Sequence, residues 1–209
     1  MVQQTHATPS KPPSGSGTSR PGSSTRIGVD VTFLRMMRPP SGETPRLPGA
    51  YDLLTVARPT VGFYRYLYAT VGRDYCWWLR RMTPDAEIAA LLADPRLSLH
   101  VLYHQGEPGG FFELDGRHGN EVNIGYFGLM PHLVGQGIGS AFLQAAIAEA
   151  WRRTGMRPGA AIRVNTCTAD HPRALGAYVR AGFCPVRTVR EVWDIPDRLG
   201  LPIPARLRV

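Results

Sequence analysis

The chain has 209 residues, 43% of them apolar and 19% charged, which suits one globular domain with a sizeable core. No stretch approaches about 18 uninterrupted apolar residues, and the N-terminus lacks the apolar run of a secretory signal, so we expect a cytoplasmic protein with no membrane span. Three cysteines, an odd number spread along the chain, predict free thiols. No Cys or His pair has metal-ligand spacing, and no metal site is expected.

The formal net charge is +8, from 24 Lys and Arg against 16 Asp and Glu. A basic domain can hold nucleic acid or a polyanionic cofactor, and composition alone does not choose between them. The sequence shows neither a helix with clustered Arg and Lys nor a recognisable stacking platform, so no nucleic-acid partner is expected.

Residues 1–26 are dominated by Ser, Thr, Gly and Pro and contain almost no large apolar residue. Such a segment cannot bury enough surface to offset the entropy lost on ordering. We therefore predict a disordered tail over 1–26 and a single domain over 27–209.

The first elements of the domain are predicted to be a strand and two helices. The alternating, β-branched segment 29–34 indicates the strand. Apolar residues at helical spacing indicate a helix over 59–71. Thr83 as N-cap and Pro84 at the first helical position indicate a second helix that ends near residue 93.

The rest of the domain alternates between strands and helices. Strand-like segments are separated by Gly- and Pro-containing turns, and apolar stripes mark the helices. The order of strand, two helices, three strands, helix, strand, helix and strand predicts a mixed α/β fold with a partly antiparallel sheet. The strands are expected over 97–104, 110–114, 121–130, 160–167 and 183–193, and the helices over 137–153 and 171–181.

A glycine-rich turn between a predicted strand and helix is the most informative segment. Gly135, Gly137 and Gly139 let the backbone approach a ligand closely, and the helix adds its free N-terminal amides and dipole. Together they indicate an anion site suited to a pyrophosphate; the alternative is a tight turn without a ligand. Ser140 stands where a dinucleotide-binding fingerprint needs its third glycine, and no Gly-Lys-Ser/Thr follows, so neither common phosphate-binding motif is met.

A second motif lies downstream, over residues 170–183, where a helix carries Ala174, Tyr178 and a terminal Gly182-Phe183 pair. With the glycine turn, it resembles the signatures of the GNAT acetyltransferase superfamily. The resemblance implies a mixed, mostly antiparallel central sheet flanked by about four helices. It also implies acetyl-CoA as acyl donor, an amine acceptor that is a small molecule or peptide, and the homodimers common among relatives.

The resemblance also implies which residues hold acetyl-CoA. Phe127 and Leu129 match the strand positions whose backbone pairs with the pantetheine arm. His171 stands where many relatives have an asparagine that contacts the cofactor; alternatively it is the first residue of a helix capped by Asp170. The pyrophosphate would be bound by the amides of Val134, Gly135, Gln136, Gly137, Ile138, Gly139 and Ser140, although the family often has Arg or Gln where this chain has Val134.

Tyr178 matches the family's general acid, which protonates the departing thiolate; the alternative is a core aromatic. The family's glutamate base aligns with Asn123, which accepts no proton at neutral pH. Glu121, on the same strand face, is the candidate base acting through a water. Alternatively, Glu121 is a solvated residue at the edge of the strand. The amine could also be deprotonated by water alone, with no dedicated side chain. Cys167 is predicted to be a structural thiol rather than a nucleophile.

Aromatic residues crowd the first predicted helix, where the family shapes its acceptor pocket. Most are expected in the core; Tyr64 and Tyr68, off the face of Phe63 and Leu67, are the expected exceptions. The positive charge favours carboxylate-bearing amines over polycationic acceptors. The predicted function is acetyl transfer from acetyl-CoA to a primary amine by direct attack. The alternative, favoured by Asn123 and Val134, is a non-catalytic acyl-CoA-binding sensor or interaction module.

Overall fold

The computed structural model describes residues 22–42 and 46–209. Most of the predicted disordered tail, residues 1–21, lies outside the described residues. The first strand begins at Ser24, so residues 24–26 belong to the sheet and the predicted tail boundary at residue 26 is wrong. Their backbones pair with the last strand, a long-range interaction that local composition cannot report.

A single seven-stranded sheet forms the centre of the molecule, in the order β2-β3-β4-β5-β6-β1-β7. Every neighbouring pair is antiparallel except β5 and β6, which are parallel. This confirms the predicted fold class. The strands are β1 Ser24–Met36, β2 Tyr51–Val56, β3 Leu97–His104, β4 Glu107–His118, β5 Glu121–Leu129, β6 Ala161–Cys167 and β7 Cys184–Pro196.

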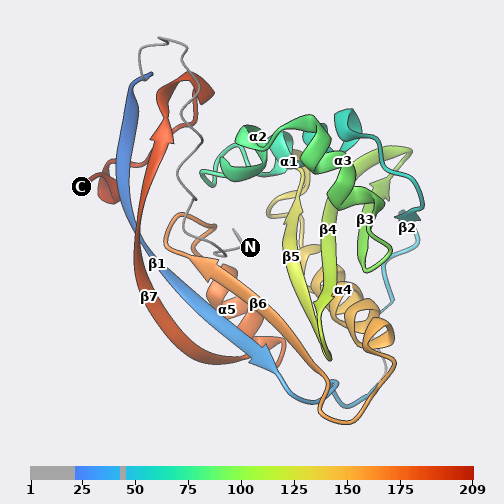
Figure 1. The fold of residues 1–209 in the computed structure, drawn as a ribbon. Helices are drawn as coiled ribbons and strands as arrows, with labels where there is room; N and C mark the ends of the chain where they lie inside the picture. The colour runs from blue at the N-terminus through green and yellow to red at the C-terminus, as the bar shows by residue number, and fades with distance from the viewer. Residues whose placement is uncertain (1–21, 43–45) are drawn as a thin grey trace.

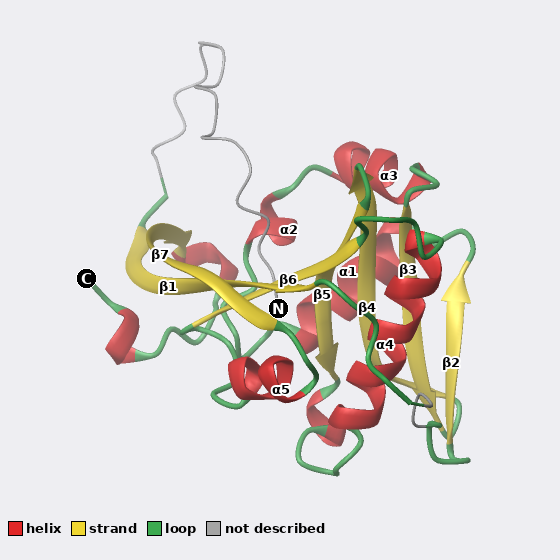
Figure 2. Cartoon of the chain, turned by 90° about the horizontal axis from the view of Figure 1, so that it is seen from below, coloured by secondary structure: helices red, strands yellow, loops and turns green. Residues whose placement is uncertain are grey.

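Within residues 22–42 and 46–209, five α-helices accompany the sheet, with α4 on one face and α1 on the other (Figure 2). None of the helices in the described part of the chain is long and apolar enough to cross a membrane. The α-helices are α1 Val61–Val71, α2 Leu79–Met82, α3 Asp85–Ala93, α4 Gly139–Thr154 and α5 Ala174–Arg180; short 3₁₀ helices are η1 Pro131–Leu133, η2 Asp197–Leu199 and η3 Ala205–Leu207.

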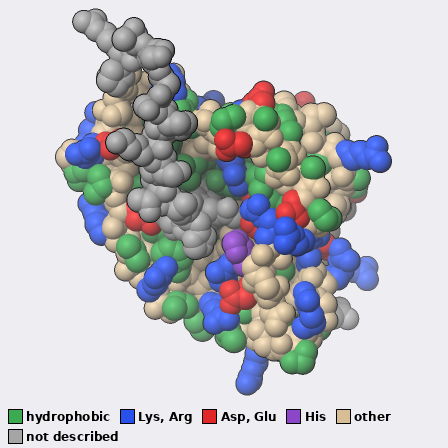
Figure 3. All heavy atoms as spheres, in the orientation of Figure 1, with side chains coloured by type: hydrophobic (Ala, Val, Ile, Leu, Met, Phe, Trp, Pro, Cys, Tyr) green, Lys and Arg blue, Asp and Glu red, His purple; other side chains and the backbone are tan. Residues whose placement is uncertain are grey.

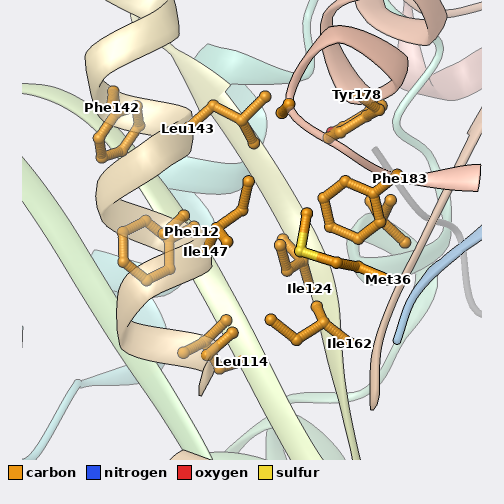
Figure 4. Close-up of a cluster of buried hydrophobic side chains, with 14 of the residues drawn as sticks. Met36, Phe112, Leu114, Ile124, Phe142, Leu143, Ile147, Ile162, Tyr178 and Phe183 are labelled. Atoms are coloured by element: carbon orange, nitrogen blue, oxygen red, sulfur yellow. The ribbon is translucent and has the colours of Figure 1, made fainter. Parts of the chain in front are cut away.

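Alternation along the central strands divides the core between the two faces of the sheet. Phe112 faces α4, in the cluster of Figure 4, whereas its neighbour Phe111 packs with the aromatic residues of α1. A third cluster lies beneath β1 and β7 and includes Trp193 and Leu207 near the C-terminus. Strands β1 and β7 curve away from the rest of the sheet (Figure 1).

Two short elements, β2 and α2, were not predicted. β2 is a six-residue edge strand that leaves Leu54 exposed, so its pattern lacks a buried face. The prediction that Thr83 is the N-cap of α3 is wrong. The Thr83 hydroxyl donates to the carbonyl of Leu79, 3.0 Å away, and so closes α2. Pro84 is the N-cap of α3 and offers no side-chain hydrogen bond.

Candidate functional site

The two parallel strands diverge soon after they pair. β5 contacts β6 only from Glu121 to Asn123, opposite Ala161 to Arg163. Beyond that point β5 stays with β4 and β6 stays with β1, and Figure 1 shows the two strands spreading apart. The edge of β5 that faces β6 therefore has no strand partner from Ile124 onward, and its backbone groups can pair with an extended ligand.

A β-bulge marks the start of the divergence. Glu113 of β4 lies opposite Tyr126, whereas Leu114 lies opposite Ile124, so Gly125 is the extra residue on β5. A Cβ atom added to Gly125 would lie 2.8 Å from Oε1 of Glu113, so the glycine makes room for this carboxylate. Bulges of this kind redirect side chains and are frequent beside active sites.

The glycine turn follows β5 directly and leads through η1 into α4. Gly135 and Gly137 have φ values of +86° and +83°, which a residue with a side chain rarely adopts. The amides of Val134 and Gln136 donate to the carbonyls of Pro131 and Leu133 and so shape the turn. These two amides thus have partners within the turn, and their predicted contact with phosphate stays a prediction.

The remaining amides of the turn fit an anion. Among the described residues, no backbone hydrogen bond of the turn uses the amides of Gly135, Gly137 or Gly139. α4 is 16 residues long, has no acidic residue in its first turn and begins at Gly139. Its first amides, including those of Gly139 and Ser140, have no carbonyl partner within the helix and carry the positive end of its dipole.

Aromatic packing holds this helix end against β5. Phe142 is fully buried, with its ring centroid 5.6 Å from that of Phe112 and 4.9 Å from that of Phe127. A Cβ atom at Gly139 would lie 3.7 Å from Leu129, so the turn and the end of β5 are in contact. The partly buried side chains of Phe127 and Leu129 pack against this core.

Tyr178 is the one fully buried side chain of α5. Its ring makes edge contacts with Phe183 at 5.8 Å and Phe127 at 6.5 Å, so it lies beside the diverging part of β5 (Figure 4). Burial, with a smaller contribution from Asp170, raises the pKa of the phenol well above its usual range. The side chain is a core aromatic, and burial favours its protonated form, so burial in the core is compatible with the predicted role of an acid.

The start of α5 differs from the prediction. The helix begins at Ala174, not at His171, and Asp170 does not cap it. Instead the buried Asp170 carboxylate accepts from the Thr166 hydroxyl at 2.7 Å and from the amide of Cys167 at 2.8 Å. His171 lies outside the helix, accepts from the amide of Arg173 at 3.1 Å and packs against a tyrosine ring.

The three cysteines, all in the described part of the chain, are thiols that form no disulfide with one another, in agreement with the prediction. Burial, and secondarily the charge of Asp170, raises the pKa of the Cys167 thiol far above neutrality. A thiol held protonated in this way is a poor nucleophile, which agrees with its predicted structural role.

Glu121, which remains a predicted base, lies between two arginines. Its carboxylate is ion-paired with both Arg35 and Arg163, the latter at 2.9 Å. Glu121 also lies at the start of β5, where the strands are still paired, six residues or roughly 20 Å along the strand from Phe127. Asn123 is closer, since it is the last residue paired with β6, but it cannot accept a proton.

Glu113, on β4, is a buried acid beside the diverging strand that the sequence analysis did not single out. It is fully buried and accepts a 2.7 Å hydrogen bond from the hydroxyl of Tyr64. The guanidinium of Arg80 lies 3.6 Å from its other oxygen and 5.6 Å from the ring centre of Tyr126. Burial raises the pKa of the Glu113 carboxyl, and the positive charge of Arg80 opposes this. An acid within the apolar run Phe111-Phe112-Glu113-Leu114 was the signal that could have identified it.

The expected exceptions among the aromatic residues are also wrong. Tyr64 and Tyr68 are fully buried, whereas Tyr66 is 50% exposed, because α1 turns a different face to the sheet. The hydroxyl of Tyr68 accepts from the amide of Arg80 at 3.3 Å, and Arg65 donates to the Arg80 carbonyl at 2.8 Å. These bonds fix α2, and with it Arg80, over the sheet.

Among the residues the structure describes, no three or more His, Cys, Asp or Glu side chains are grouped closely enough to hold a metal ion. On the face seen in Figure 3, basic side chains are spread out and several stand beside acidic ones.

Comparison with known proteins identifies the class. A model of the acetyltransferase (GNAT) family matches residues 55–183, more than half of the chain, and the match includes β5, the glycine turn, α4 and α5. The chain therefore belongs to this family, whose members transfer an acyl group, and the family resemblance seen in the sequence is confirmed.

Individual relatives are more distant. The mycothiol acetyltransferase of Nocardia farcinica (strain IFM 10152) is 32% identical over 123 residues, which cover 58% of this chain and 37% of the relative. Two solved structures share the fold: GCN5-related N-acetyltransferases from Sphaerobacter thermophilus (TM-score 0.58, 17% identity, 83% of this chain and 54% of that one) and Kribbella flavida (0.54, 16%, 85% and 63%). The chain thus spans less than two thirds of the length of each.

Proposed function

We propose that this protein is an N-acetyltransferase that moves the acetyl group of acetyl-CoA to a primary amine by direct attack. The observation that carries the proposal is continuity: the unpaired edge of β5 leads directly into the glycine turn, whose free amides lie at the N-terminus of α4. An extended chain ending in a pyrophosphate fits this arrangement, because the strand edge offers hydrogen bonds and the turn offers positive charge.

In this proposal the chain binds its acyl donor mainly through the backbone. The groups of β5 from Phe127 to Leu129 pair with the pantetheine arm. The pyrophosphate is received by the amides of the turn, and those of Val134 and Gln136 also shape the turn itself. The amides are those of Val134, Gly135, Gln136, Gly137, Ile138, Gly139 and Ser140. His171, beside the start of α5, remains a predicted cofactor contact. Because backbone amides do this work, the absence of Arg or Gln at position 134 removes only one side-chain contact.

Tyr178 is proposed as the general acid. The thiolate that leaves the thioester needs a proton, and the Tyr178 phenol lies beside Phe127 on the proposed pantetheine strand. Because burial keeps it protonated, the acid form is present throughout the neutral pH range. The proposed acceptors are small molecules, amino acids or peptides, and the cytoplasmic location and homodimer remain predictions.

A non-catalytic acyl-CoA-binding module is the second candidate, favoured by Asn123 at the position of the family's usual base. The two are separated by assaying thiol release from acetyl-CoA with a panel of primary amines, for wild type and Tyr178→Phe. We expect turnover in wild type, a drop of about 10²–10⁴-fold in kcat for the variant, and equal acetyl-CoA binding by both. Binding without turnover would favour the module, and no binding would exclude both.

A further inference from the structure

The proposed donor site binds acetyl-CoA through the backbone and does not define which amine accepts the acetyl group. We propose that Glu113 and Arg80 form the acceptor end: Glu113 takes the proton of the acceptor amine, and Arg80 holds a carboxylate carried by the same molecule. The acceptor class is then an α-amino acid or a similar amine with a neighbouring carboxylate. This inference rests on the proposed function.

Position is the first argument. The Glu113 carboxylate lies against Gly125, the bulge residue at which β5 has just left β6. Its strand, β4, pairs with one edge of β5, and the thioester arm is proposed to lie along the other edge. The carboxylate is therefore beside the β5 backbone at the level where β5 parts from β6. The carboxylate is on the α1 side of the sheet, as its hydrogen bond to Tyr64 shows, and α4 is on the other side.

The pattern of hydrogen bonds is the second argument. One oxygen of Glu113 is held by Tyr64, but Oε1 has no hydrogen-bond partner among the described residues. The Nε and Nη2 groups of Arg80 are also buried and make no hydrogen bond of normal geometry among the described residues, although Nη2 lies 3.6 Å from Oε1 and the side chain interacts with Tyr64 and Tyr126. Buried polar atoms are nearly always hydrogen-bonded, so an acceptor oxygen and two donor groups side by side indicate a polar ligand.

The other candidate bases, on β5, are less suited to accept a proton than Glu113. Glu121 is engaged by two arginines, and Asn123 cannot accept a proton. A buried carboxylate, by contrast, binds a proton more strongly than one in water, which favours its use as a base. The other ionisable groups that act on Glu113 are Tyr64 on α1, Arg80 on α2, Tyr126 on β5, and Asp115 and Arg117 on β4.

Charge identifies the acceptor class. Glu113 and Arg80 together are neutral, and both are largely buried, with side-chain exposures of 0% and 15%. An ammonium ion alone would bring an uncompensated charge into this site, which is costly. An amine that carries its own carboxylate brings no net charge, and it supplies an acceptor for the guanidinium and a donor for Oε1.

In the proposed reaction, protons move between the acceptor amine, Glu113, Tyr178 and solvent. The ammonium gives one proton to Glu113, and the amine lone pair attacks the thioester carbonyl carbon. The N–C bond forms and the C–S bond breaks, and the leaving thiolate takes the proton of Tyr178. The nitrogen's surplus proton passes to solvent, from which Tyr178 recovers its own, and Glu113 releases its proton before the next cycle.

The substrate class is tested with the 20 common amino acids as free acids and as carboxamides, which lack the carboxylate. Wild type should prefer free acids in kcat/KM, and Arg80→Met should raise KM for them about 10–100-fold while leaving the carboxamides nearly unchanged. Arg80→Lys should retain part of the preference. Arg73→Met, at an exposed arginine just after α1, is the matched control. Equal use of acids and carboxamides by wild type would overturn the carboxylate role.

The base role is tested with Glu113→Gln, which keeps the acceptor for Tyr64 and removes the proton-accepting charge. We expect kcat to fall about 10²–10⁴-fold and the acidic limb of the pH–rate profile to disappear, with circular dichroism and acetyl-CoA binding unchanged. Exposed Glu87→Gln on α3 is the control. An unchanged pH profile in Glu113→Gln would overturn this role. Absence of turnover by wild type with every amine, or absence of acetyl-CoA binding by wild type, would instead refute the proposed function itself.

Discussion

Ser140→Glu is expected to stabilise the free protein and to weaken its binding of acetyl-CoA. Ser140 is exposed in the first turn of α4, which contains no acidic residue. A carboxylate there interacts favourably with the helix dipole, by about 0.3–1 kcal/mol. For a domain of this size the gain corresponds to a rise in Tm of about 1–4 °C.

The same carboxylate would stand where the pyrophosphate is proposed to bind. Acetyl-CoA at 100 times its Kd should stabilise wild type by about 2.7 kcal/mol, or about 5–10 °C. A like charge about 4 Å from the phosphate, in a setting between water and protein surface, costs about 1–4 kcal/mol of binding energy. At the same ligand concentration, the shift in the variant should therefore fall by a third or more.

The assay is thermal unfolding with and without acetyl-CoA, using Ser140→Gln as a control of the same size without charge. The control should keep the full ligand shift and lack the rise of the free protein. An acetyl-CoA shift in Ser140→Glu equal to that of wild type would refute the pyrophosphate site. A fall in the Tm of the free variant would contradict the account of the helix end.

Three further predictions concern the surrounding structure. Gly125→Ala would place a methyl group 2.8 Å from Oε1 of Glu113, so we expect turnover to fall while acetyl-CoA binding persists; unchanged turnover would count against the acceptor site. Phe142→Ala should lower the free energy of unfolding by about 3–5 kcal/mol, measured in urea, because the ring is fully buried between two aromatic residues. Burial lowers the pKa of His100 to about 4. Between about pH 6.5 and 4 the imidazole is protonated in the unfolded chain but not in the folded one. The free energy of unfolding should therefore fall by up to about 3 kcal/mol as the pH is lowered through that interval. His100→Gln should flatten this dependence in urea titrations at pH 7 and 4.5, and an equal slope in both proteins would show that another group is responsible.

Local patterns were sufficient where the chain forms structure with its neighbours in sequence. The helix α4, the glycine turn before it and the strands of the central sheet follow from apolar periodicity and turn chemistry, and the predicted ranges lie close to those observed. The two family motifs were visible for the same reason, because each is a continuous segment. Weak patterns failed: the edge strand β2 and the four-residue α2 bury too little to leave a periodic signal.

What each acidic side chain does was decided only by the tertiary structure. Glu121 and Glu113 are both glutamates on neighbouring strands, and in the sequence Glu121 stands nearer the expected catalytic position. The fold brings two arginines to Glu121 from β1 and β6, but brings a tyrosine from α1 and a bulge from β5 to Glu113. Partners contributed by distant segments set the charge and burial of a side chain, and a linear pattern carries no information about which segments will meet. The sequence by itself determined the family, the glycine turn and the helical segment that carries Tyr178, whereas the fold determined where the strands part and which carboxylate lies there.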